Sequence, residues 1–345
     1  MKVGNMTHTL LSQEPLPSIK ELNKILAPYQ KANLRQSLFQ LATTLVPYFV
    51  LWYLMILSLS VSYALTLVLA AVSALFLVRI FIFFHDCGHN SFFPTTRANK
   101  LAGFWLGVLV FTPGEQWWHS HAIHHATSGN LDKRGIGDVF TMTSEEYISA
   151  GWFKRLGYRL VRNPVVMFGL GPIFMFFIAN RLPMPLFGKK ETWSVIWNNV
   201  AVLAVATVMS LLIGVKAYLM IQLPVMYIAG AMGIWLFFIQ HQFEDEYWAR
   251  EGEWNYVASA LLGASFYKLP RVLQWFTGNI GYHHIHHLSP RIPNYYLEQA
   301  HNSSFLFQKW THLINFGEGY RCVRLKVWDE IIHRMNGYPK VHQGL

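Results

Sequence analysis

Charge is scarce in this chain, and its scarcity limits the classes of protein to which the chain can belong. Only 13% of the 345 residues are charged, whereas 53% are hydrophobic. A soluble domain usually has about 25% charged residues, roughly twice this share. We therefore expect an integral membrane protein rather than a soluble one.

Cysteines and secretion signals are also nearly absent. The two cysteines, Cys87 and Cys322, are too few for a disulfide framework and neither lies in a CxxC segment, so nothing requires an oxidising compartment. Residues 1–37 are polar and lack the apolar run and small-residue cleavage site of a secretory signal. We expect these residues to form a cytoplasmic N-terminal arm, and the first apolar run to remain as a membrane anchor.

The charge that is present is mostly positive, with a formal net charge of +10. A basic chain can bind nucleic acid, but the high apolar content favours cationic loops beside an anionic membrane leaflet. We therefore expect membrane lipids, and no nucleic acid, among the partners. An acidic protein could bind to the same basic surface.

Two long apolar runs carry one charged residue each. Arg79 is the only charged residue from Leu38 to Phe84, and Lys216 is the only one from Trp193 to Ile239. Because about 20 residues span a bilayer as a helix, each run is long enough for two spans. We predict two helical hairpins, with spans at about 38–58, 62–84, 193–213 and 217–239.

Lysine and arginine indicate the orientation of these helices. The turns inside the hairpins contain only Lys216, whereas the N-terminal arm, the 85–192 connection and the chain after 240 contain nearly all the other cations. Because cytoplasmic loops carry an excess of these residues, both termini and the long connection should be cytoplasmic. Arg79, near the end of its span, is expected to extend to the interface. Two shorter apolar stretches, 101–112 and 164–180, are interpreted as interfacial or re-entrant segments.

The expected fold is an all-α integral membrane protein with four transmembrane helices and a cytoplasmic helical cap. Residues 38–300 would form the membrane domain, and residues 301–345 a cytoplasmic C-terminal tail. A large soluble protein with buried helices is the alternative, and two separate runs with a single charge each argue against it. We expect the cap to hold a histidine-rich site for two metal ions.

Most of the 16 histidines fall in four places along the chain. On a helix, residues three and four apart share a face, so the histidines of each cluster can point in one direction. The first cluster begins at the predicted cytoplasmic end of the second span, and another histidine directly follows the fourth span. All four places therefore fall on one side of the membrane. The predicted metal ligands are His85, His89, His121, His124, His125, His241, His283, His286 and His287.

These histidines are too numerous for a single ion. A structural zinc has four protein ligands and a catalytic zinc usually three, so the set suits two ions. Imidazole binds zinc, copper, iron and nickel alike, so the ligand type does not choose the metal. Iron is favoured by the wider pattern and by the apolar setting, where oxygen-dependent attack on a C–H bond is a plausible task. His119 and His284 break the helical spacing and are interpreted as bystanders. Groups that could accept a hydrogen bond from a ligand are Asp86, Glu115, Asp138, Glu244, Asp245 and Asn279.

Gly88 lies inside the first histidine cluster. A glycine lowers the stability of a helix, so its presence here indicates close packing or a local irregularity.

The clusters resemble the three histidine boxes of the membrane-bound fatty acid desaturase family. The boxes occur in order, as HDCGH at 85–89, HAIHH at 121–125 and HHIHH at 283–287. Their flanks are similar too: NSFF follows the first box, ATSGN the second and LSPRIPN the third. A single HxxHH would be weak evidence, but three boxes around two predicted hairpins are specific. The resemblance covers most of the chain from about 38 to 300.

The resemblance implies an enzyme that uses O2 to introduce a cis double bond into a fatty acyl chain. It implies a non-haem di-iron centre bound by the histidines of the three boxes and by His241, which stands outside a box. The HDCGH form of the first box is similar to the branch of the family that acts on acyl groups of membrane glycerolipids. The chain has no GxGxxG followed by a helix and no fused haem domain, so the electrons are expected from an external carrier such as ferredoxin or cytochrome b5.

Other functions remain open. Acyl or alkane hydroxylation and carotenoid oxidation occur on related histidine boxes, and analysis of the product separates them from desaturation. A zinc transporter or histidine-rich sensor is a more distant alternative, because transport sites normally place ionisable ligands inside the spans. No HExxH segment of a metalloprotease is present.

Overall fold

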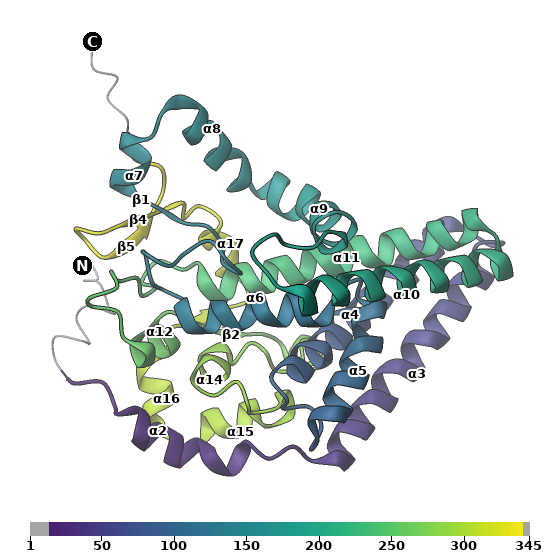
Figure 1. The fold of residues 1–345 in the computed structure, drawn as a ribbon, viewed down its shortest axis with the longest axis horizontal. Helices are drawn as coiled ribbons and strands as arrows, with labels where there is room; N and C mark the ends of the chain where they lie inside the picture. Colours follow the sequence, from purple (N-terminus) through teal and green to yellow (C-terminus); the bar gives the residue numbers. More distant parts are fainter. Residues whose placement is uncertain (1–13, 341–345) are drawn as a thin grey trace.

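The computed structural model describes residues 14–340, so parts of the predicted N-terminal arm and C-terminal tail lie outside the described residues. The described chain is mostly helical, with four long helices whose ends meet a group of short ones (Figure 1). The long helices are α3 (Leu34–Ser58), α4 (Tyr63–Gly88), α10 (Lys189–Ile213) and α11 (Val215–His241). The short helices used below are α2 (Ile19–Leu26), α5 (Thr96–Leu109), α6 (Gly114–Thr127), α7 (Ser144–Ser149), α8 (Trp152–Val161), α9 (Gly171–Phe177), α12 (Tyr256–Leu262), α13 (Arg271–Phe276), α14 (His283–Leu288), α15 (Leu297–Asn302), α16 (Phe305–Trp310) and α17 (Gly319–Cys322).

The four long helices coincide with the two apolar runs. Each is long and apolar enough to cross a bilayer, which confirms the prediction of a mostly helical protein with four candidate membrane spans. α4 continues past its apolar run into the first histidine box, and α11 likewise ends on His241. Gly214 separates α10 from α11 with a φ of +86°, a conformation that glycine adopts without strain.

α4 and α11 are the central pair of the long helices. α4 packs against α3 on one side and α11 on the other, and α10 packs against α11. In Figure 1, α10 and α11 extend together away from the short helices, so their connecting turn lies far from the cap. α10 buries little of its surface and exposes Leu203, Leu211 and Leu212. Such a face suits the hydrocarbon of a bilayer.

The position of Arg79 differs from the expectation. Its side chain is buried in the protein rather than extended to the interface. Nε donates a hydrogen bond to Thr44 Oγ1 at 3.1 Å, and Nη1 donates to the main-chain carbonyl of Trp275 in α13. The guanidinium carbon also lies 4.0 Å from the centroid of the Trp275 ring. The expectation was wrong because α13, which is distant in sequence, places the carbonyl and the ring of Trp275 beside the buried guanidinium.

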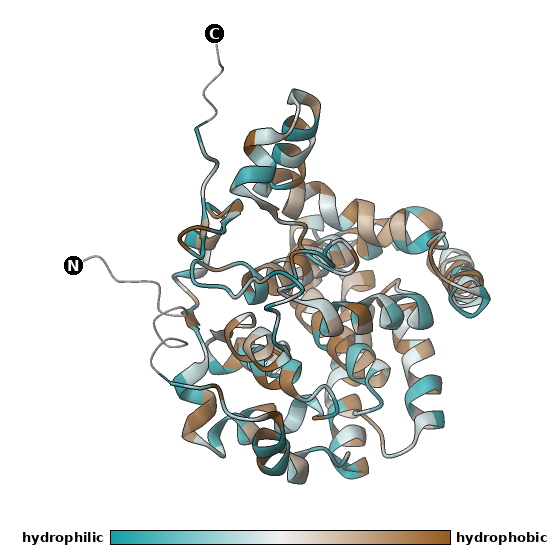
Figure 2. Cartoon of the chain, turned by 60° about the vertical axis from the view of Figure 1, so that its left-hand side comes forward, coloured by the Kyte–Doolittle hydropathy of each residue, from teal (hydrophilic) through white to brown (hydrophobic). Residues whose placement is uncertain are grey.

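The short helices form a cap at one end of α4 and α11, with a hydrophobic core of its own. This core buries Leu26 of α2, Leu261 of α12, Ile285 of α14 and Phe307 of α16. In Figure 2, hydrophobic and hydrophilic residues alternate along these short helices, as expected of elements with one buried face. The core fixes α14, and with it the third histidine box, against the rest of the cap.

Two small sheets connect distant parts of the cap. β1 (Met142–Thr143) pairs in parallel with β4 (Val327–Asp329), which pairs in antiparallel with β5 (Arg334–Asn336). β2 (Phe266–Lys268) pairs in parallel with β3 (Leu313–Asn315). The first sheet therefore attaches the last part of the described chain to the segment between α6 and α7.

The two weaker apolar stretches form short, interrupted elements. The stretch 164–180 contains a turn of π-helix at Val166–Leu170, followed by α9. Taken together, α8 and the segment Val166–Arg181 are long and apolar enough to cross a bilayer, but the chain bends by 60° at the break between them. The stretch 101–112 lies mostly in α5, whose 14 residues are too few to cross a bilayer. Their assignment as interfacial or re-entrant segments stays a prediction.

The surroundings of Gly88 are closely packed, as its position in the sequence indicates. A Cβ atom on Gly88 would lie 2.2 Å from Cδ1 of Trp118, and Trp118 Nε1 is held by a hydrogen bond of 3.1 Å to the Phe84 carbonyl. We expect Gly88→Ala to destabilise the protein by about 1–3 kcal/mol through overpacking between α4 and α6.

Thermal unfolding of the purified protein in detergent tests this expectation. Gly157→Ala is the matched control, because Gly157 lies within α8 and a Cβ there meets no atom within 4 Å. The control should be neutral or stabilising by up to about 1 kcal/mol. Equal midpoints for the two variants would show that α4 and α6 are not packed as described.

Candidate metal centre

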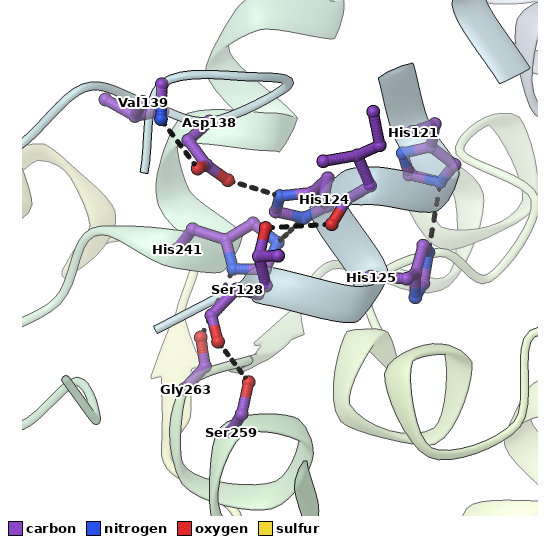
Figure 3. A network of polar contacts seen from close by, with 12 residues as sticks. His121, His124, His125, Ser128, Asp138, Val139, His241, Ser259 and Gly263 are labelled. Carbon is purple, nitrogen blue, oxygen red and sulfur yellow. Dashed lines mark hydrogen bonds and ion pairs between the residues drawn. The ribbon is translucent and has the colours of Figure 1, made fainter. Parts of the chain in front are cut away.

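Histidines of α4, α6, α11 and α14 converge where the long helices meet the cap. The five-histidine group comprises His85, His89, His121, His125 and His286, and the four-histidine group comprises His124, His241, His283 and His287. Within each group, one ring nitrogen from every histidine lies within 4.8 Å of those from all the others. In Figure 3, His124 and His241 face each other while His121 and His125 approach one another further along. All the histidines predicted from the sequence are therefore brought together.

Helix geometry explains how the histidines of the three boxes are distributed between the two groups. Residues four apart are rotated by about 40° around the helix axis, whereas residues three apart are rotated by about 60° in the opposite sense. Every pair of histidines four apart accordingly stays in one group: His85 with His89, His121 with His125, and His283 with His287. The third histidine of each of the last two boxes, His124 or His286, belongs to the other group.

Three of the histidines have their Nδ1 atoms held by hydrogen-bond acceptors. Nδ1 of His85 lies 3.0 Å from Asp86 Oδ1, Nδ1 of His124 lies 2.7 Å from Asp138 Oδ1, and Nδ1 of His241 lies 3.2 Å from the Gly263 carbonyl. Figure 3 shows the last two contacts on either side of the His124–His241 pair. A carboxylate and a carbonyl only accept, so each Nδ1 donates its hydrogen, and in the neutral imidazole the lone pair is then on Nε2.

In the neutral imidazoles, the Nε2 lone pairs of His124 and His241 face each other. The two Nε2 atoms are 3.1 Å apart. With both rings neutral, no hydrogen lies between them and the contact is repulsive without a metal ion. A shared metal ion removes the repulsion: two imidazole nitrogens each about 2.1 Å from one ion are about 3.0–3.4 Å apart. The residues therefore fit a bound metal.

The same spacing recurs elsewhere in both groups. Nε2 of His85 lies 3.0 Å from Nε2 of His286, and Nε2 of His121 lies 3.1 Å from Nε2 of His125. In the four-histidine group, Nε2 of His283 lies 2.8 Å from that of His241. In addition, Nε2 of His89 is buried without a hydrogen-bond partner. Converging nitrogens and an unpartnered one are both expected where an ion binds.

Burial favours the neutral form of five imidazoles on α6 and α14. The pKa values of His121, His125, His283, His286 and His287 all lie well below the ordinary value, first because burial penalises the charged form and then because neighbouring histidines repel one another. Since only neutral imidazole ligates a metal, the cap holds the side chains in the form that binding requires.

The structure separates the bystanders from the two groups. His119 is partly exposed, stacks on the Phe187 ring, and contacts Glu191 through Nδ1 at 3.0 Å. His284 is buried one residue away from a group member, but its Nε2 lies 2.9 Å from Nδ1 of His301 instead. Neither residue belongs to a group, and both positions suit control substitutions.

Of the six candidate acceptors, Asp86 and Asp138 contact a grouped histidine. The others contact different partners: Glu115 pairs with Lys190, Glu244 and Asp245 pair with Arg334, and Asn279 donates to the Asn294 carbonyl. Sequence reasoning missed two contributors, the Gly263 carbonyl and Asn294. Asn294 donates to Asp86 Oδ2 from both its main-chain nitrogen and Nδ2, at 2.8 and 2.9 Å. Asn294 could have been found, because it lies in the LSPRIPN flank of the third box. The Gly263 carbonyl could not, because a main-chain group has no sequence signal.

A small cavity adjoins the four-histidine group. Its lining includes His124, His241, Gln242, Glu246 and Asp138. Burial raises the pKa of the Glu246 carboxyl well above its usual range, although the nearby Arg162 partly opposes this rise.

Asp138 provides a test of how His124 is oriented. Loss of an acceptor that fixes the tautomer of a ligand typically lowers metal affinity by about 10- to 100-fold. We expect Asp138→Ala to weaken binding to this extent, measured by titration of metal-free protein with Fe(II). Asp132→Ala is the control, because Asp132 is exposed and pairs with Arg250 away from the histidines. Equal affinities for both variants would remove Asp138 from the site.

Comparison with known proteins gives a consistent result. The family model described as fatty acid desaturase matches residues 58–309. A fatty acid desaturase of Bacillus subtilis (strain 168) is 48% identical over 311 residues, which cover 90% of this chain and 88% of the relative. The family model extends through all three boxes and through the last three of the four candidate spans.

More distant plant proteins are also similar. An endoplasmic reticulum omega-3 fatty acid desaturase of Vigna radiata var. radiata is 29% identical over 65% of this chain and 60% of its own length. A chloroplastic sn-2 acyl-lipid omega-3 desaturase (ferredoxin) of Helianthus annuus is 28% identical over 64% of this chain and 51% of its own length. The aligned part is therefore little more than half of each plant protein.

Proposed function

This chain belongs to the fatty acid desaturase family, and from that premise we propose that it introduces a cis double bond into a fatty acyl chain with O2 as oxidant. One observation carries the proposal: the histidines of three separate boxes and His241 meet as two adjacent groups at the ends of candidate spans. A site there lies beside lipid, where acyl chains are found.

We assign one iron ion to each histidine group, the first to the five-histidine group and the second to the four-histidine group. When bound, the two irons would supply the redox chemistry that couples reduction of O2 to the removal of hydrogen from unactivated methylenes. The overall reaction balances as –CH2–CH2– + O2 + 2 electrons + 2 protons giving –CH=CH– + 2 water. No further catalytic residues are assigned beyond these metal ligands.

The protein's own groups contribute position and protonation state. Asp86, Asp138 and the Gly263 carbonyl fix three imidazoles with Nε2 directed into the site. Asn294 holds Asp86 in turn and so couples the first box to the segment after the third. The surrounding burial limits the access of water, which strengthens the electrostatic interactions in the site.

The substrate that we propose is an acyl group of a membrane glycerolipid. The HDCGH form of the first box supports this class, as does the similarity to a plant protein named as an acyl-lipid desaturase. The two electrons would come from an external carrier of the ferredoxin or cytochrome b5 type, and the name of the same relative includes ferredoxin. The net charge of +10 suits an acidic carrier.

We propose that the cap, the metal site and both termini face the cytoplasm. The support is the distribution of cations, since the turns between α3 and α4 and between α10 and α11 contain none, and Lys216 in the first turn of α11 is the cation beside them. The cap, by contrast, contains Lys133, Arg134, Arg250 and most of the other cations.

Product analysis tests the proposed reaction. The chain is expressed in a host with a simple fatty acid profile, and membrane fatty acid methyl esters are examined by gas chromatography–mass spectrometry, with a carrier and its reductase co-expressed. A new species lighter by two hydrogens is expected, and derivatisation locates its double bond. A hydroxylated species would instead assign the chain to oxygen insertion. Metal accumulation by the membranes without any new lipid would favour transport.

A further inference from the structure

α8 carries a continuous apolar surface that the rest of the described protein does not cover. Phe153 is 82% exposed, and Trp152, Leu156, Leu160 and Val161 are also exposed. Single exposed apolar residues are normal on a protein surface, but a contiguous set of this kind marks an interaction surface. At 100° per residue, the first four of these side chains fall within about 100° of one another around the helix.

The opposite face of α8 is attached to the cap. Tyr158 is buried, its hydroxyl accepts a hydrogen bond of 3.1 Å from the Met142 main-chain nitrogen, and it donates to the Lys326 carbonyl. Arg162, directly after the helix, is also buried and donates to Gln242 Oε1 and to the Leu325 carbonyl. Since β1 and β4 hold this face, the rotation of the helix is fixed and its apolar side points away from the cap.

Cations lie on both borders of the apolar face. Lys154 lies beside Val161 on one side of the apolar surface, and Arg159 lies beside Trp152 on the other side with Arg155 behind it. The sequence contains no acidic residue from Trp152 to Phe187, so no carboxylate within this segment neutralises them. Arg159 also contacts Tyr147 and Tyr338 of the cap. An apolar face bordered by lysine and arginine is complementary to an anionic lipid surface.

The chain after α8 packs against one of the candidate spans. α9 packs against α11, and a Cβ on Gly230 of α11 would lie only 2.9 Å from the Phe176 ring. On its outer side α9 exposes Phe174 and Ile173. Figure 1 shows α8 leading from α7 toward α9 along one edge of the molecule. The exposed apolar residues of α8 are therefore followed along the chain by those of α9, which packs against a candidate span.

From these observations we propose that α8 lies in the headgroup layer of the membrane and binds acidic phospholipid. Its apolar side chains enter the upper part of the acyl region, while Lys154, Arg155 and Arg159 contact the phosphates at the borders. Tyr158 and Arg162, on the side of α8 opposite its apolar face, attach the helix to the cap. α8 thereby sets the distance of the cap, and of the histidine groups, from the membrane surface. This inference concerns lipid contact and does not depend on the reaction that the site catalyses.

Spin labelling of the full chain in proteoliposomes tests the location of α8. Nitroxide labels are attached at Phe153→Cys and Leu160→Cys, with Ile331→Cys as the control. Ile331 is equally apolar and 90% exposed, but it lies in the turn between β4 and β5. The native cysteines are buried, so the unsubstituted protein should take up little label. Elution as one species in detergent verifies that each variant is folded.

Collision with two relaxing agents reports the depth of each label. Labels at 153 and 160 should collide more often with O2, which concentrates in the bilayer, than with a water-soluble nickel complex. The label at 331 should show the opposite preference. If the labels at 153 and 160 behave like the label at 331, α8 is not in the membrane and the proposal fails.

Lipid composition tests the requirement for acidic headgroups. The label at 153 should lie deeper in vesicles that contain phosphatidylglycerol than in vesicles of phosphatidylcholine alone, and salt should reduce the difference. The double substitution Lys154→Gln and Arg155→Gln should also reduce it. The same depth in both kinds of vesicle would overturn the assignment of α8 to acidic phospholipid.

Discussion

Substitution of His286 by alanine is expected to abolish formation of the unsaturated product. Its Nε2 lies 3.0 Å from Nε2 of His85, and its ring also approaches the rings of His89 and His125. His286 is thus the only member of the third box in the five-histidine group. Loss of a group that merely orients a ligand typically costs about 10- to 100-fold, so loss of the ligand itself should lower activity by more than about 100-fold.

The measurement is the amount of desaturated fatty acid formed per molecule of protein in the membrane. His119→Ala is the control for the general effect of removing a histidine, because His119 belongs to neither group and is partly exposed. It should retain activity within a few-fold of the unchanged protein. His284→Ala is a second, more demanding control, since His284 is buried between two group members. Activity in His286→Ala similar to that of His119→Ala would refute the assignment of His286 to the metal site.

His241→Ala is expected to lower product formation as much as a substitution inside a box. His241 stands alone in the sequence, yet its Nε2 lies 3.1 Å from that of His124 and 2.8 Å from that of His283. Its removal leaves three histidines in the four-histidine group and leaves the five-histidine group complete. We therefore expect the iron content to fall from about two per chain toward one, together with a loss of product of more than about 100-fold.

Elemental analysis of purified protein and product analysis of the same preparation provide the two readouts. His312→Ala is the matched control, because His312 also lies in the cap and stacks on Phe243 but belongs to neither group. The control should keep both irons. If His241→Ala retained two irons and full activity, the four-histidine group would not be a metal site.

The sequence predicts which histidines come together in the fold, because the relevant information is local. The spacing of HDCGH, HAIHH and HHIHH places histidines on one side of a helix, and the apolar runs place the first box and His241 at the ends of two spans. Both kinds of pattern depend on neighbours within one helix. They require no knowledge of which helices pack together.

The division into five and four histidines depends on tertiary structure. Helix geometry keeps His121 with His125 and separates them from His124, but it does not determine which partners each face meets. Those partners are set by the packing of α4 against α11 and of α14 within the cap core. The contacts of His241 with Gly263 and of Asp86 with Asn294 depend on the same packing.

Arg79 shows the limit of reasoning from hydropathy. A single arginine near the end of an apolar run is expected to extend to the interface, because its stem is long enough. In the folded chain, Thr44 and the end of α13 lie beside it and satisfy its hydrogen bonds inside the protein. α13 was not predicted as an element, so this partner could not be anticipated.

Reconstitution of the metal-free protein with Fe(II) tests the central claim most directly. Purified protein is stripped of metal and placed in lipid with a suitable carrier, reductant and O2, and the desaturated product is measured as Fe(II) is added. The account predicts no product without iron, a maximum at about two irons per chain, and no restoration by zinc. Full activity in the metal-free protein, or with zinc alone, would contradict the assignment of two iron ions to the two histidine groups.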